Sequence, residues 1–89
     1  MGITVRVAST LRQYTEQMAE INLEGRTVGE VIENFKKRFP EADSRVFSSK
    51  ASRFMILYLN DQDIRSLDGV DTPVSGNDTL SIVFAISGG

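Results

Sequence analysis

The last three residues of the chain could do chemistry that little else in it can. Ser87-Gly88-Gly89 follows directly after a segment with the pattern of a β-strand. Glycine has no Cβ, so a Gly-Gly end can pass through a narrow channel in backbone conformations that other residues avoid. The alternative is an ordinary frayed terminus. At average glycine usage, chance alone would place glycine at both of the last two positions in about one of 200 chains. The tail therefore suggests that the Gly89 carboxylate is a reactive group. Whether the tail is functional has to be judged from the rest of the sequence.

Other groups with catalytic potential are scarce. The sequence has no Cys and no His, which excludes disulfides, thiolate nucleophiles, the common zinc sites and imidazole acid–base chemistry. An acidic cluster could suggest calcium, and it comprises Asp61, Asp63, Asp68 and Asp71. An EF-hand loop begun at Asp61 would need Gly and Glu where this chain has Ser66 and Thr72. We therefore expect no metal site, no bound cofactor and no catalysis by the chain itself; without a P-loop, ATP would have to come with a partner.

Composition indicates one globular domain. The chain has 89 residues, of which 40% are hydrophobic and 25% charged. A net charge of −2 and a pI near 5.0 argue against a phosphate-binding surface, so nucleic acid is not an expected partner. The longest apolar run, Phe54–Leu59, is too short to span a membrane, and the N-terminus lacks the features of a signal peptide. We expect a cytoplasmic protein with no membrane partner.

Hydrophobic alternation predicts the strands. Residues 3–7, 19–24 and 80–85 place apolar side chains at every second position, which is typical of strands with one buried face. Residues 53–59 predict the strongest strand, and a turn after it leads to a very short strand at 63–64.

One segment has helical spacing. Thr27 and Glu30 form a capping box, and the apolar residues that follow predict a helix over 28–39, ended by Pro40. The polar stretch 41–52 is expected to hold a turn or a short helical piece. Strands early and late with one main helix between them predict an α+β domain in which the helix covers one face of the sheet.

Within the strand predicted over residues 53–59, the segment Phe54–Leu59 is apolar at every position, although a helix on one side of the sheet should produce alternation. The hydroxyl of Tyr58 needs a partner or water, so its side chain should lie on the face away from the helix. That assignment places Met55, Leu57 and Leu59 in the core. It forms an outer patch from Phe54, Ile56, Tyr58 and Val83. Such a patch indicates a surface for a protein partner, although single exposed apolar side chains are common on any protein.

Four segments together resemble the ubiquitin-like MoaD/ThiS family of sulfur carriers, over nearly the whole chain. They are Thr27–Ile32 at the helix start, Leu59–Arg65 after the central strand, Gly76–Leu80 entering the last strand, and Ser87–Gly89. The resemblance implies a β-grasp fold: a mixed four- to five-stranded sheet with one main helix packed on one face. Residues 1–85 would form this domain, and residues 86–89 a flexible tail.

Within the family, three segments look most like the carrier that serves O-phosphoserine-dependent cysteine synthesis: Arg53-Phe54, Asn60–Asp63 and Ala85–Gly89. Small archaeal modifiers look similar. The small subunit of molybdopterin synthase usually has a Pro-Pro pair where this chain has Phe84-Ala85. A role in molybdopterin synthesis is therefore less favoured, but it is not excluded.

The resemblance also implies a mechanism. An E1-like adenylating partner would use ATP to convert the Gly89 carboxylate to an acyl-adenylate, and sulfur would then replace AMP. The thiocarboxylate would donate its sulfur to a second partner, either a cysteine synthase or the large subunit of molybdopterin synthase. Gly88, Ser87 and Ile86 would be recognised along the partner's channel.

Two other functions stay open at this point. A protein modifier would use the same activated Gly89 to form isopeptide bonds with target lysines. A non-covalent binding module would bind partners through the domain and leave the tail inert.

Overall fold

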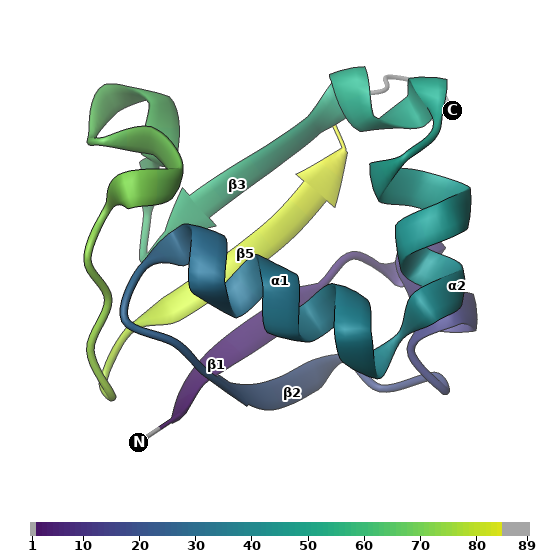
Figure 1. Ribbon diagram of the computed structural model, residues 1–89, viewed down its shortest axis with the longest axis horizontal. Coiled ribbons are helices and arrows are strands. Elements are labelled where there is room, and N and C mark those ends of the chain that lie inside the picture. The colour runs from purple at the N-terminus through teal and green to yellow at the C-terminus, as the bar shows by residue number, and fades with distance from the viewer. Residues whose placement is uncertain (1, 85–89) are drawn as a thin grey trace.

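The computed structural model describes residues 2–84, in which one five-stranded sheet carries a layer of helices on one face (Figure 1). The strands are β1 (Gly2–Val7), β2 (Glu20–Glu24), β3 (Met55–Leu59), β4 (Gln62–Asp63) and β5 (Thr79–Phe84). Their order is β2-β1-β5-β3-β4. The central strands β1 and β5 run parallel, and all other neighbours are antiparallel. The predicted mixed sheet is confirmed, at the five-stranded end of its range.

The main helix, α1 (Val28–Arg38), crosses the sheet on one side, as predicted. It begins where the capping box places it, since the Thr27 hydroxyl accepts the Glu30 N–H at 3.2 Å and the Glu30 carboxylate accepts the Arg26 N–H at 3.0 Å. The helix stops one residue before the predicted end, and Phe39 closes it as the C-cap. Its sheet-facing side chains are buried: Val28, Val31, Ile32 and Phe35.

The core lies between α1 and the inner face of the sheet. Phe35 is fully buried and belongs to the same hydrophobic cluster as Ile3 and Val5 of β1 and Leu80 and Ile82 of β5. Gly25 allows the close passage from β2 into α1, because its φ is +156° and a Cβ there would lie 2.6 Å from the Val31 side chain.

Helical turns fill the stretch between α1 and β3, as the sequence predicts. They are α2 (Pro40–Ala42), the π-helix η2 (Asp43–Phe47) and the 3₁₀-helix η3 (Lys50–Phe54). Two boundaries differ from prediction. The strand expected from Arg53 begins at Met55, because the backbone before it is committed to local bonds such as Ser52 N–H to the Ser49 carbonyl at 3.1 Å. The short strand is Gln62–Asp63 rather than 63–64, because Ile64 turns inward, is buried and starts η4 (Ile64–Ser66).

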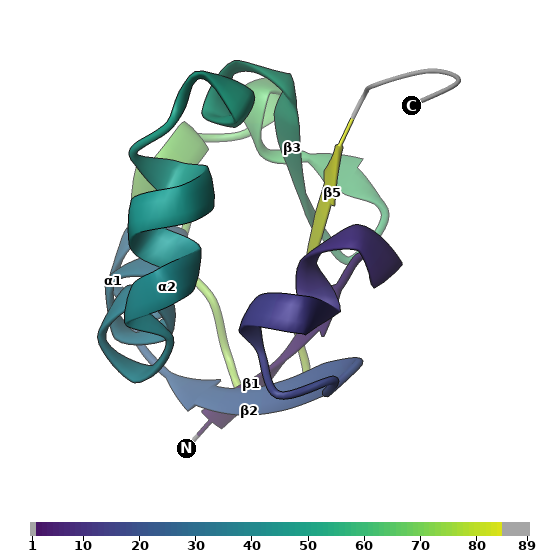
Figure 2. The same ribbon diagram turned by 90° about the vertical axis from the view of Figure 1, so that its right-hand side faces the viewer.

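Another 3₁₀-helix, η1 (Ser9–Tyr14), joins β1 to β2, and it buries Leu11 in the core. The Nε of Arg12 donates to the Val7 carbonyl at 3.2 Å and holds η1 against the end of β1. Figure 2 shows α1 and α2 on one side of the molecule and the sheet on the other, with η1 beside the end of β5.

The loop before β5 contains η5 (Gly69–Asp71). Among residues 2–84, no helix is long and apolar enough to cross a membrane.

Candidate docking face and tail base

The face of the sheet away from α1 carries a small apolar patch next to the end of β5. Ile56 and Val83 are direct cross-strand partners, so their side chains lie side by side on this face. Tyr58 lies two residues further along β3, on the same face. None of these three side chains belongs to the buried core, whereas Met55 and Leu57 pack against it and Leu59 is buried. The predicted assignment of β3 side chains to the two faces is confirmed.

Phe54, the fourth predicted member of the patch, is not in the strand. It ends η3, and its side chain is 44% exposed. Because Met55 pairs with Phe84, the last described residue of β5, Phe54 borders the patch at the end of the sheet where the tail begins. The structure therefore places Phe54, Ile56 and Val83 near the start of β3, where β5 ends. Tyr58 lies further along β3, toward the turn at Asn60.

A polar row bounds the patch on its other side. Strand register places Glu20, Arg6, Ser81, Tyr58 and Asp63 in a line across all five strands. The row is closed by ion pairs at both edges, Arg6–Glu20 at 3.4 Å and Asp63–Arg65 at 2.6 Å. The guanidinium of Arg65 and its backbone N–H, both bonded to the carboxylate, lower the pKa of Asp63. Because these charges are paired within the chain, the apolar Ile56–Val83 pair is the part of this face best suited to a dry contact.

A groove lies at the same end of the sheet, where β5 ends, and its lining includes Val83 of the patch. It has a volume of about 510 Å³ and lies between η1, η2 and the last two residues of β5. Much of its lining is apolar and comes from Leu11, Tyr14, Val46 and Phe84. Arg45 also lines the groove. The sequence analysis missed this groove because its walls come from segments more than 30 residues apart. Val46, an apolar residue within a polar stretch, was a local signal for it.

The four predicted tail residues, Gly89, Gly88, Ser87 and Ile86, lie outside the described residues. So does the domain boundary expected after residue 85, and both stay predictions. Within residues 2–84, no group of three acidic side chains is arranged to hold a metal ion, and Asp63 of the acidic cluster instead binds Arg65.

The sequence profile of the ThiS family matches residues 5–89, which is nearly the whole chain. The chain belongs to the ThiS family. Members are sulfur carriers without catalytic activity of their own; they bind no cofactor, and ATP-using enzymes of the E1-like class activate them. The predicted family, the carrier class and the absence of catalysis by the chain are thereby confirmed.

Individual relatives support the same placement. The sulfur carrier protein CysO of Mycobacterium tuberculosis is 29% identical over an alignment of 93 positions that covers all of both chains, and its crystal structure superposes with a TM-score of 0.82. A chain of the Amycolatopsis orientalis BexX/CysO complex is 32% identical, with a TM-score of 0.84 and coverage of 98% of this chain and 99% of that one. The small archaeal modifier protein 1 of Methanosarcina acetivorans shares the fold, with a TM-score of 0.83 at 22% identity over 99% of this chain and 96% of that one. The ThiS-family chain thus has the predicted β-grasp fold.

Proposed function

We propose that this ThiS-family protein carries sulfur as a thiocarboxylate on Gly89 and donates it for cysteine synthesis. The observation that carries the pathway is the 29% identity to CysO over the full length of both chains. Molybdopterin synthesis is the second candidate pathway, and it is less favoured because Phe84-Ala85 replaces the usual Pro-Pro pair.

The chemistry divides between the carrier and its partner. A Gly89 carboxylate oxygen attacks the α-phosphorus of ATP, pyrophosphate leaves, and the chain ends in an acyl-adenylate. A sulfide nucleophile then forms a C–S bond at the same carbonyl carbon, and AMP leaves with the original oxygen. The carrier supplies a carboxylate on a narrow Gly88-Gly89 end, whereas the partner supplies the charge stabilisation that both steps require.

The described residues support this role by their placement. β5 runs directly toward the tail, and Ile56 and Val83 form an apolar pair on the outer face at that end of the sheet. A partner that covers Phe54, Ile56, Tyr58 and Val83 would hold the domain while Ile86 and Ser87 lead Gly89 into its active site. The BexX/CysO complex, with a chain of the same fold, supports the expectation of a stable partner contact. Activation and use of the sulfur would both take place in the cytoplasm.

The test is ATP–pyrophosphate exchange catalysed by the E1-like enzyme of the same genome. The untagged carrier should stimulate exchange, Gly89→Ala should slow it sharply while the domain stays folded, and deletion of Gly88 and Gly89 should abolish it. Equal exchange with the deleted chain would contradict the role of Gly89 and favour a binding module with an inert tail. Adenylation followed by conjugation to target lysines, with no thiocarboxylate, would favour a protein modifier.

A further inference from the structure

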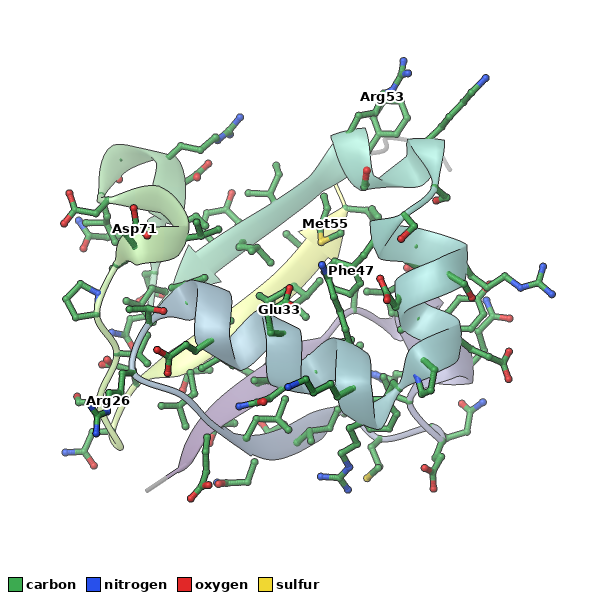
Figure 3. The ribbon with its side chains drawn as sticks, in the orientation of Figure 1. Arg26, Glu33, Phe47, Arg53, Met55 and Asp71 are labelled. Atoms are coloured by element: carbon green, nitrogen blue, oxygen red, sulfur yellow. The ribbon has the colours of Figure 1, made fainter. Side chains whose placement is uncertain are left out.

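The two ends of the β3–β5 strand pair differ in the charge of the segments that flank them. From Ser44 to Asn60 the sequence has three cations and no carboxylate, whereas from Asp61 to Asp78 it has five aspartates and one arginine. The first segment leads into the start of β3, beside the end of β5, and the second occupies the opposite end of the same two strands. In Figure 3, Arg53 lies by the helical turn before β3, and Asp71 lies in the turns beyond the other end of that strand.

The three cations belong to helical turns at the end of the sheet where β5 ends. Arg45 lines the groove that also contains Val83 and Phe84 of β5. Arg53 is two residues from Met55, the cross-strand partner of Phe84, and Lys50 begins the same 3₁₀-helix. All three residues are exposed, and among the ion pairs between described residues none involves them. Asp43 in η2 is the carboxylate nearest to them in sequence. Three exposed cations outnumber it, so they create a local positive potential on a protein whose net charge is −2.

We propose that Arg45, Lys50 and Arg53 guide the tail end of the carrier onto an acidic surface around the entrance of the adenylating enzyme's active site. The inference rests on the proposed function for the identity of that enzyme. We assign the contact to the adenylating enzyme rather than to a sulfur acceptor because activation is the first step of both covalent fates of Gly89.

The length of the tail separates this role from direct binding of ATP. Residues 85–89 span at most about 17 Å when extended, at roughly 3.4 Å per residue. When the tail is threaded into a channel, the cations at its base stay at the channel mouth and face the enzyme surface instead of the nucleotide. Charges at an interface rim act mainly on the rate of association and on its salt dependence.

The experiment compares two double variants with the same change in net charge. Arg45→Gln with Arg53→Gln removes two cations at the tail base. Arg26→Gln with Lys37→Gln removes two exposed cations elsewhere, and Figure 3 shows Arg26 far from Arg53. Association of each with the adenylating enzyme is measured by stopped flow from low to high ionic strength. Melting curves confirm that the variants are folded.

The tail-base variant should associate about tenfold more slowly than wild type at low salt, within the range of electrostatic steering, and the gap should close at high salt. The control variant should stay within about twofold of wild type, and adenylation at saturating carrier should be unchanged in both. Equal association rates for the two variants would contradict the proposal that these cations guide association. A raised KM for ATP in the tail-base variant, with a normal association rate, would contradict it as well. Charge-dependent association without adenylation of the wild-type chain would support the guide and contradict the proposed function.

Discussion

Asn60 and Asp78 join the two turns at the end of the sheet opposite the tail. The Nδ2 of Asn60 donates to the Asp78 carboxylate at 3.1 Å. The Thr79 N–H donates to the Oδ1 of Asn60 at 3.1 Å, and the Asn60 N–H donates to the Thr79 carbonyl at 2.7 Å. The other carboxylate oxygen of Asp78 accepts the Ser75 N–H at 2.8 Å. Two of the segments that carry the family resemblance therefore meet in one hydrogen-bonded junction, which fixes the register of β3 on β5.

The junction should contribute measurably to stability. Asp78→Ala removes the acceptor for both Asn60 and Ser75, so we expect the free energy of unfolding to fall by about 1–3 kcal/mol. Asn77→Ala, an exposed neighbour, is the matched control and should change it by less than about 0.5 kcal/mol. Urea unfolding measures both. Equal losses in the two variants would show that the side-chain bonds contribute nothing beyond the turn itself.

Stability should also depend on pH through Asp78. Hydrogen bonds from Asn60 and from the Ser75 backbone lower the pKa of the folded carboxyl. A carboxyl with a depressed pKa stabilises the fold above its unfolded value of about 3.9, and this contribution is lost as the pH falls through the folded value. The stability difference between wild type and Asp78→Asn should therefore shrink between about pH 5 and pH 2. A difference that stays constant over this interval would contradict the assigned pKa direction.

Two neighbouring residues on β3 test the outer patch. Ile56→Asp should change the free energy of unfolding by less than about 1 kcal/mol and weaken binding to the adenylating enzyme at least about tenfold, because Ile56 faces outward beside Val83. Leu57→Asp, the matched control, places a charge against the core and should destabilise the fold by several kcal/mol. Thermal melts and titration calorimetry give both quantities. A large fall in Tm for Ile56→Asp would reverse the assignment of faces.

The same substitution at two phenylalanines separates core from surface. Phe35 is fully buried, and its ring centroid lies 5.3 Å from that of Phe39 and 5.7 Å from that of Phe47. Phe35→Ala should therefore lower the free energy of unfolding by about 3–5 kcal/mol. Phe54 is 44% exposed, so Phe54→Ala should cost less than about 1 kcal/mol. Its effect should be on partner binding instead. A comparable loss of stability at both positions would place Phe54 in the core.

Most of the architecture could be predicted because the deciding signals are local. The capping box at Thr27, the helical spacing after it and the alternation in β1 and β5 each act within a few residues, and the structure confirms them. The face assignment on β3 needed only the hydroxyl of Tyr58, since a strand has two faces.

The parts that could not be predicted depend on residues distant in sequence. Phe54 belongs to a helical turn because the segment before Met55 bonds within itself, which apolarity alone does not reveal. The groove at the tail base and the grouping of Arg45 with Arg53 arise only when η1, η2 and η3 gather at the end of β5.

The most direct test of the account is the intact mass of the untagged protein after incubation with ATP, a sulfide source and the adenylating enzyme of its genome. We expect a mass gain equal to the exchange of one oxygen for sulfur, absent when Gly89 is deleted. An unchanged mass, with binding of the adenylating enzyme demonstrated in the same sample, would contradict the assignment of this protein as a thiocarboxylate carrier.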